Sequence, residues 1–204
     1  MIAQTKESQS KLNPQKALEL LKEGNNRFIN NKSTSKDLLG QVKATSEGQF
    51  PYAVVLSCID SRTSSELIFD LGIGDIFNAR VAGNIVNEDV LGSMEYSCKV
   101  AGSKLVLVLG HTKCGAVTAA CQKVELGNIT KLLSKVQPAV RKIESQVDDV
   151  TSPDAVQKVA DENVRMAMEE IRSKSEILAE MEKNGEISIV GGMYDVGSGK
   201  VTFF

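Results

Sequence analysis

Apolar residues of this chain gather in short runs, and most of these runs have the features of buried β-strands. They are rich in β-branched side chains and are bounded by Gly, Pro or polar residues, as is usual for strands of a buried parallel sheet. We expect inner strands near residues 52–57, 76–80, 104–110 and 186–196, and an edge strand after a turn within 197–204. These runs predict the strands of one central sheet.

Segments in which apolar residues recur with helical spacing separate the predicted strands. The first is predicted to begin at Asn13 and Pro14, because Asn is a good N-cap and Pro suits the first helical position, and to end near Asn30. Further helices are expected at 64–71, at 88–100, from about 114, and across 128–183 with a break at Ser152 and Pro153. Strands that alternate with helices predict an α/β fold: a mostly parallel central sheet flanked by helices, with an N-terminal helical arm and a C-terminal edge strand.

The sequence has no repeat, low-complexity tract or clear linker, which predicts a single domain over residues 13–204 after a mobile tail at residues 1–12. The net charge of −2 argues against a dedicated nucleic-acid-binding protein, which is usually basic. No apolar stretch approaches the ~18 residues of a membrane span, and the polar N-terminus has no signal-peptide core. The prediction is therefore a cytoplasmic protein without nucleic-acid or membrane partners.

Four cysteines, Cys58, Cys98, Cys114 and Cys121, raise the question of metal binding. In a chain of this length without a signal peptide, metal binding or catalysis is favoured over disulfide bonds. Cys98 and Cys121 fall within helical patterns, where reduced thiols of the core are expected. The other two stand near strand ends, and the single histidine of the chain, His111, is close to Cys114.

Cys58, His111 and Cys114 form the candidate metal site. Cys58 ends the first predicted strand, and His111-x-x-Cys114 spans the turn between a later strand and the next helix. Ligands of α/β sheets bind beyond the carboxyl ends of the strands, so these side chains are expected to meet there. Two thiolates and one imidazole suit zinc, and three protein ligands leave one tetrahedral position open, as in catalytic sites. Three separate buried residues without a metal are the alternative.

Asp60 and Arg62 follow Cys58 at alternate positions. Residues two apart in an extended stretch point the same way, so the three side chains are expected to share one side. Arg62 is the natural bidentate partner of the Asp60 carboxylate. The pair strengthens the weak signal of a lone H-x-x-C motif, although a surface salt bridge is the alternative.

The combination of C-x-D-x-R with a later H-x-x-C-G resembles the signature of the β-class carbonic anhydrases. The similarity continues in order through ALELLKEGNNRF, GDIFNARVAGN, MEYSCKVAGSKLVLVLGHTKCGAV and GGMYDVGSGKV, and it covers about residues 14–204. The resemblance implies an enzyme with one Zn²⁺ per chain that interconverts carbon dioxide and bicarbonate. It also implies self-association as dimers or tetramers.

The resemblance assigns roles to individual residues. It makes Cys58, His111 and Cys114 the zinc ligands, and Asp60 and Arg62 a catalytic pair that orients the nucleophile. It places in the substrate pocket Gln49, Phe77, Ala82, Tyr96 and Gly115. Val55 stands where the allosteric, bicarbonate-inhibited members carry Trp, and this chain has no Trp. The similarity is therefore to the plant-like members, in which the site is always open.

Three other functions stay open at this point. Hydrolases of carbon disulfide or carbonyl sulfide share the zinc motif. A non-catalytic structural or regulatory module stabilised by zinc would need four protein ligands. A cysteine hydrolase would use Cys58 or Cys114 with His111, but the sequence offers no evident partner to orient the histidine.

Overall fold

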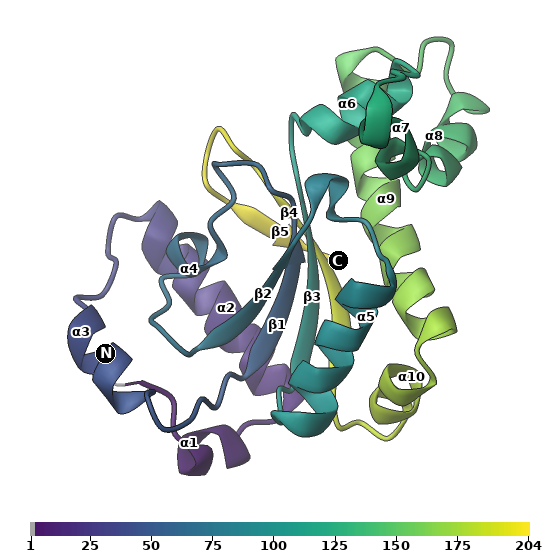
Figure 1. The fold of residues 1–204 in the computed structure, drawn as a ribbon. Helices are drawn as coiled ribbons and strands as arrows, with labels where there is room; N and C mark the ends of the chain where they lie inside the picture. Colours follow the sequence, from purple (N-terminus) through teal and green to yellow (C-terminus); the bar gives the residue numbers. More distant parts are fainter. Residues whose placement is uncertain (1–2) are drawn as a thin grey trace.

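A five-stranded sheet forms the centre of the protein across residues 3–204, which the computed structural model describes (Figure 1). The strand order is β2-β1-β3-β4-β5. The strands are β1 (Ala53–Ser57), β2 (Ile76–Arg80), β3 (Leu105–His111), β4 (Ser188–Tyr194) and β5 (Val201–Phe203). The first three pairings are parallel, and β5 runs antiparallel to β4 at the edge. The predicted mostly parallel sheet with a C-terminal edge strand is confirmed.

Helices cover both faces of this sheet (Figure 1). They are α1 (Lys6–Ser10), α2 (Pro14–Ile29), α3 (Leu38–Ala44), α4 (Ser65–Ile68), α5 (Glu88–Glu95), α6 (Gly115–Cys121), α7 (Gly127–Leu133), α8 (Gln137–Glu144), α9 (Pro153–Lys174) and α10 (Glu176–Lys183). A 3-10 turn, η1 (Ala82–Asn84), follows β2, and a π-helical turn, η2 (Tyr96–Val100), follows α5. The helix expected at 88–100 is therefore divided, and α3 has no counterpart in the prediction. No helix of the described chain is both long enough and apolar enough to cross a membrane.

The two faces of the sheet bury separate apolar clusters. Side chains alternate along β1, so Val54 and Leu56 lie on one face while Ala53 and Val55 lie on the other. The first face packs against α5, α6, α8, α9 and α10, and the second packs against α2 and α4. Because helices cover both sides, β1 and β3 are buried along their whole length.

Helix α2 forms the N-terminal arm and packs on the sheet of its own chain (Figure 1). The side chain of Asn13 caps it by accepting a hydrogen bond from a first-turn amide at 2.8 Å. Ala17 and Leu21 face the sheet and are fully buried. Gly24 approaches α4 so closely that a Cβ there would lie 1.9 Å from the carbonyl oxygen of Phe69. The arm is thus part of the core around β1 and β3.

Helix α1 departs from the mobile tail expected at residues 1–12. Gln9 is buried, and its side-chain amide donates to the carbonyl oxygens of Pro51 at 2.7 Å and Ala101 at 2.8 Å. These bonds fix α1 to the segments that precede β1 and β3. The polar composition that suggested mobility supplies the hydrogen bonds of the docked helix instead. Residues 1–2 lie outside the described residues.

Candidate metal centre

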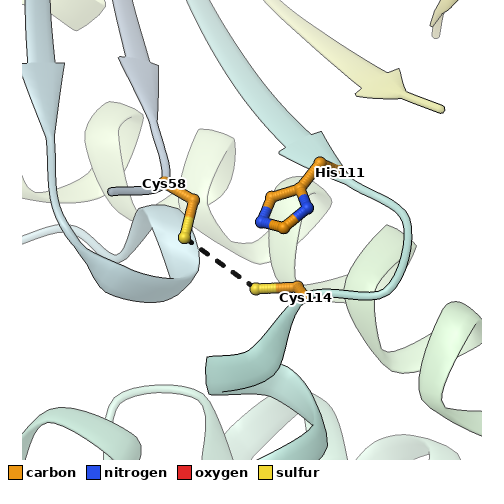
Figure 2. A group of neighbouring side chains, drawn as sticks. All are labelled: Cys58, His111 and Cys114. Atoms are coloured by element: carbon orange, nitrogen blue, oxygen red, sulfur yellow. Dashed lines mark hydrogen bonds between the residues drawn. The ribbon is translucent and has the colours of Figure 1, made fainter. Parts of the chain in front are cut away.

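Cys58, His111 and Cys114 meet at the carboxyl ends of neighbouring strands (Figure 2). Cys58 directly follows β1, His111 is the last residue of β3, and Cys114 is the N-cap of α6. Because β1 and β3 pair in parallel, both segments leave the sheet at the same edge. The candidate ligand atoms lie within 4.8 Å of one another, the two sulfurs are 4.0 Å apart, and all three residues are buried. The structure thus brings together the group predicted from the sequence.

The imidazole of His111 is held in one orientation. Its Nδ1 lies 2.9 Å from the carbonyl oxygen of Thr112, and because a carbonyl only accepts hydrogen bonds, Nδ1 carries the proton. Thr112 is fixed in turn: its amide donates to the carbonyl oxygen of Tyr194 at 2.9 Å, and its hydroxyl oxygen accepts from the amide of Val196 at 3.1 Å. Nε2 is left as a buried nitrogen without a hydrogen-bond partner. Such a lone pair beside two sulfurs fits a bound metal ion.

The thiols of Cys58 and Cys114 are coupled through their contact. The hydrogen bond with Cys114 lowers the pKa of the Cys58 thiol, and the same bond, together with burial, raises the pKa of Cys114. The Cys58 sulfur also accepts a hydrogen bond from the amide of Gly83 at 3.4 Å. Two sulfurs and one imidazole nitrogen are a donor set that zinc prefers, and a divalent cation supplies the positive charge that two buried thiolates require. The residues present therefore fit zinc.

Asp60 and Arg62 form a bidentate ion pair beside this group. Arg62 donates from Nε to Oδ1 of Asp60 at 2.9 Å and from Nη2 to Oδ2 at 2.8 Å, and its amide donates to Oδ1 at 3.0 Å. These bonds hold the pKa of the Asp60 carboxyl well below its usual range. Oδ2 also lies 3.9 Å from Nε2 of His111. The predicted pairing is confirmed, and it leaves the carboxylate next to the candidate ligand atoms.

Ala82 and Gly115, two of the predicted pocket residues, adjoin the metal centre. Ala82 opens the η1 turn and precedes Gly83, whose amide contacts the sulfur of Cys58. Gly115 is the first residue of α6 and directly follows the third candidate ligand. Both positions are close to the centre along the chain, and their role in binding substrate stays a prediction.

Phe77, Tyr96 and Gln49, the other predicted pocket residues, lie away from the metal centre of their own chain. Phe77 pairs in the sheet with Val54, four residues before Cys58, which corresponds to about 13 Å along a strand. The rings of Phe77 and Tyr96 meet edge to face, with centroids 6.1 Å apart, and line a hollow of about 640 Å³ that contains none of the three candidate ligands. Gln49 is exposed in the segment before β1. Their place in a substrate pocket stays a prediction.

Three residues to which the sequence analysis assigned no function support the centre: Thr63, Arg80 and Thr112. The first two donate hydrogen bonds to carbonyl oxygens of Cys58 and Asp60, and Thr112 orients the imidazole of the histidine. The contacts involve main-chain atoms, for which residue type gives no motif. The one available signal is the position of Arg80 at the end of a strand that lies beside β1.

Known proteins identify the family of the chain. The sequence model of the family described as carbonic anhydrase matches residues 53–201, which is most of the chain and includes all three candidate ligands. The chain belongs to the β-carbonic anhydrase family. This membership confirms the resemblance and identifies the protein as a zinc enzyme of carbon dioxide hydration, and Cys58, His111 and Cys114 form a group that could hold the metal ion.

Mycobacterial carbonic anhydrases are among the similar sequences. Carbonic anhydrase 2 of Mycobacterium tuberculosis (strain H37Rv) is 36% identical over 201 residues, which cover 92% of this chain and 91% of that protein. The carbonic anhydrase of Mycolicibacterium smegmatis is 32% identical over 199 residues, which cover 93% of this chain and 92% of that protein. The similarity therefore extends over nearly the whole length of both proteins.

Solved β-carbonic anhydrases share the fold. The Coccomyxa enzyme in complex with acetazolamide aligns with a TM-score of 0.74 and 26% identity, over 88% of this β-carbonic anhydrase and 82% of that chain. The Aspergillus fumigatus enzyme aligns with a TM-score of 0.71 and 27% identity, over 93% and 89% of the two chains. Tetrameric β-carbonic anhydrases of Sordaria macrospora align with a TM-score of 0.76 at 20% identity, over 93% and 97%, a likeness of fold alone.

Proposed function

We propose that this β-carbonic anhydrase catalyses the zinc-dependent, reversible hydration of carbon dioxide to bicarbonate and a proton, with Asp60 held away from the metal by Arg62. Family membership supports the activity. The observation that carries the proposal is the unpartnered Nε2 of His111, which is buried beside two sulfurs 4.0 Å apart. An open site in which Asp60 is not a ligand is supported by the ion pair with Arg62.

Each residue of the centre has a separate task in this proposal. Cys58, His111 and Cys114 would hold the zinc ion, which when bound would lower the pKa of a water molecule toward about 7 and so supply the nucleophile. Asp60, kept ionised by Arg62, can only accept hydrogen bonds, and it therefore determines where the proton of the nucleophilic water points. Arg62 aims the carboxylate through its two parallel bonds. This orientation of the proton would leave a lone pair of the nucleophile free to face the carbon of carbon dioxide.

Val55 supports a site that bicarbonate does not regulate. The bicarbonate-inhibited form carries Trp at this position, whereas Val55 is a small side chain, fully buried on the face of the sheet that packs against α2 and α4. Both carboxylate oxygens of Asp60 already accept hydrogen bonds from Arg62. A move of Asp60 onto the metal would have to break these bonds, which favours bicarbonate acting as substrate and product only.

Self-association as a dimer or tetramer is part of the proposal. Enzymes of the same fold from Sordaria macrospora are tetrameric. Apolar side chains such as Leu39, Leu67 and Val100 are 76%, 67% and 70% exposed, which offers surface for association to cover. Because Phe77 and Tyr96 lie away from their own metal centre, they line a substrate pocket only if that pocket belongs to a second copy. A cytoplasmic location is also proposed, and the four unpaired thiols are in keeping with a reducing compartment.

No observation favours the alternative functions. Among the described residues the metal group has three members, one fewer than a structural zinc module needs. Nδ1 of His111 donates to a main-chain carbonyl, so no carboxylate orients the imidazole as the general base of a cysteine hydrolase. No contact among the described residues of the site favours carbon disulfide or carbonyl sulfide over carbon dioxide as the substrate.

The proposal is tested by assaying one zinc-loaded preparation with three substrates. Stopped-flow measurement should show fast hydration of carbon dioxide, and hydrolysis of carbon disulfide and carbonyl sulfide should stay at the background level. Zinc-free protein prepared with a chelator should lose hydration and regain it on addition of zinc. Hydrolysis of carbon disulfide without hydration of carbon dioxide would overturn the proposed reaction.

A further inference from the structure

The turn that carries Cys58 and Asp60 is held by hydrogen bonds to two of its carbonyl groups. Arg80 donates from Nε to the carbonyl oxygen of Cys58 at 3.0 Å and from Nη2 to that of Asp60 at 2.7 Å. The amide of Thr63 donates to the carbonyl oxygen of Asp60 at 3.0 Å. The hydroxyl of Thr63 lies 2.8 Å from the same oxygen and 3.1 Å from that of Cys58. Thr63 and Arg80 together are called the carbonyl clamp.

The carbonyl clamp begins where the hydrogen bonds of the sheet end. Ser57 and Arg80 are the last register pair of β1 and β2, and the amide of Val81 still donates to the carbonyl oxygen of Ser57 at 3.0 Å. The chain after β1 then turns away, so its next carbonyl groups have no partner strand. The guanidinium of Arg80 continues the pairing with a side chain, and its fork spans two carbonyl groups at once. Charged donors form the stronger class of hydrogen bonds.

The clamp fixes the main chain on both sides of the catalytic side chains. Cys58 is buried, and the bonds from Arg80 and Thr63 to its carbonyl oxygen restrict rotation of the peptide group that adjoins its Cα. Asp60 is held twice, with its carbonyl group bonded to Arg80 and Thr63 and its carboxylate bonded to Arg62. A rotation of either peptide group would displace the sulfur and the carboxylate together. Functional constellations tolerate displacements of only about 0.5 Å.

We propose that Arg80 and Thr63 are positioning residues that hold the Cys58 sulfur for zinc and the Asp60 carboxylate for the nucleophile. The inference rests on the proposed zinc-dependent function. Both residues act through carbonyl oxygens, and neither belongs to the candidate ligand group. The carbonyl clamp thus increases zinc affinity and turnover, in addition to any contribution that it makes to the stability of the fold.

The test compares zinc affinity in two pairs of variants. Thr63→Val removes the hydroxyl at nearly constant volume, and Thr63→Ser keeps it. Arg80→Gln removes the charge, and Arg80→Lys keeps the charge but loses the fork that reaches both carbonyl groups. Zinc affinity is measured by competition with a chelator, and the absorption spectrum of the cobalt(II)-substituted protein reports the geometry of the metal. Hydration kinetics give kcat and KM for carbon dioxide.

Thr63→Val and Arg80→Gln should each bind zinc about 10–100-fold more weakly and change the cobalt(II) spectrum, because loss of outer-shell partners has effects of that size. The hydroxyl in Thr63→Ser should restore affinity to within about threefold of the wild type, and Arg80→Lys should resemble Arg80→Gln. In all weakened variants kcat should fall more than KM rises. Thr45→Val is the matched control, because the Thr45 hydroxyl also donates to a carbonyl oxygen, that of Gln41 at 2.9 Å, but far from the centre.

A fall in thermal stability with unchanged zinc affinity and an unchanged cobalt(II) spectrum would overturn the proposal and leave the clamp a structural role only. If Thr63→Val does not fold, the exposed Arg80 decides the question through its two variants. The proposed function fails separately, if the wild-type protein itself neither binds zinc nor hydrates carbon dioxide. Wild-type activity with unaffected clamp variants would contradict the positioning role alone.

Discussion

Asp70 provides a quantitative prediction about stability, because its carboxylate is buried among cationic partners. Nε of Arg27 in α2 donates to Oδ2 at 2.7 Å, the amide of Thr34 lies 3.1 Å from both oxygens, and Lys36 forms an ion pair with Oδ1. The Asp70 side chain is 0% exposed. The substitution Asp70→Asn removes the charge and keeps the shape. Asn also tolerates the backbone conformation at this residue, where φ is 50°.

The size of the effect follows from the pKa of the carboxyl. Burial alone would raise the pKa of Asp70, but the hydrogen bonds from Arg27, Lys36 and Thr34 outweigh burial and lower it to about 2. Compared with about 3.9 in an unfolded chain, this shift stabilises the folded protein by roughly 2.5 kcal/mol. Because the folded-state pKa is the lower one, the stabilisation is complete above about pH 5 and is lost as the pH falls through about 4 toward 2. About half of it should be gone at pH 3.

Urea unfolding of the wild type and of Asp70→Asn at pH 7 and pH 3 measures the contribution of the ionised Asp70 carboxylate to the free energy of unfolding. The variant should be about 2–3 kcal/mol less stable at pH 7, and the difference should shrink by about half at pH 3. Loss of zinc in acid affects both proteins and cancels in the difference. Asp148→Asn, at an exposed position, is the control and should change stability by less than about 0.5 kcal/mol. A difference that is independent of pH would refute the reasoning.

The remaining predictions concern the reaction. Asp60→Asn should lower kcat/KM by about 100-fold while zinc content stays at the wild-type level, because an amide can donate where the carboxylate only accepts; an unchanged rate in stopped-flow assays would contradict the role of Asp60. Bicarbonate should inhibit hydration hyperbolically, and a sigmoidal loss of activity would show that the inference from Val55 is wrong. The maximal rate should rise with imidazole-type buffer at fixed ionic strength, because the one histidine, His111, is a candidate ligand and cannot carry the proton; a rate independent of buffer would reveal an internal proton shuttle.

The sheet and the metal group were predictable because their signals are local. The apolar runs around β1 and β3 are continuous, as strands covered on both faces must be, and their ends are marked by polar residues. Parallel strands place their carboxyl ends at one edge, so Cys58 and the His111–Cys114 turn had to meet there. The spacing of two between Asp60 and Arg62 was enough to predict an ion pair.

Other features depend on tertiary contacts that leave no periodic signal. Helix α1 is short and polar, and it is ordered by two hydrogen bonds from Gln9 to carbonyl groups far away in the sequence. Helix α3 is a short helix in which Leu38 and Val42 remain exposed, so it lacks an apolar stripe facing the core. Arg80 and Thr63 bind main-chain oxygens, which are present at every residue. No sequence pattern marks which carbonyl group such a side chain will reach.

Zinc content measured together with carbon dioxide hydration, in wild type, Cys58→Ala and Cys98→Ala, tests the central claim most directly. Both cysteines are buried, but Cys98 lies outside the metal group, and burial raises the pKa of its thiol to about 12. The wild type and Cys98→Ala should each hold one zinc per chain and hydrate carbon dioxide, whereas Cys58→Ala should lose zinc and activity together. Full zinc content and a full hydration rate in Cys58→Ala would contradict the assignment of the centre.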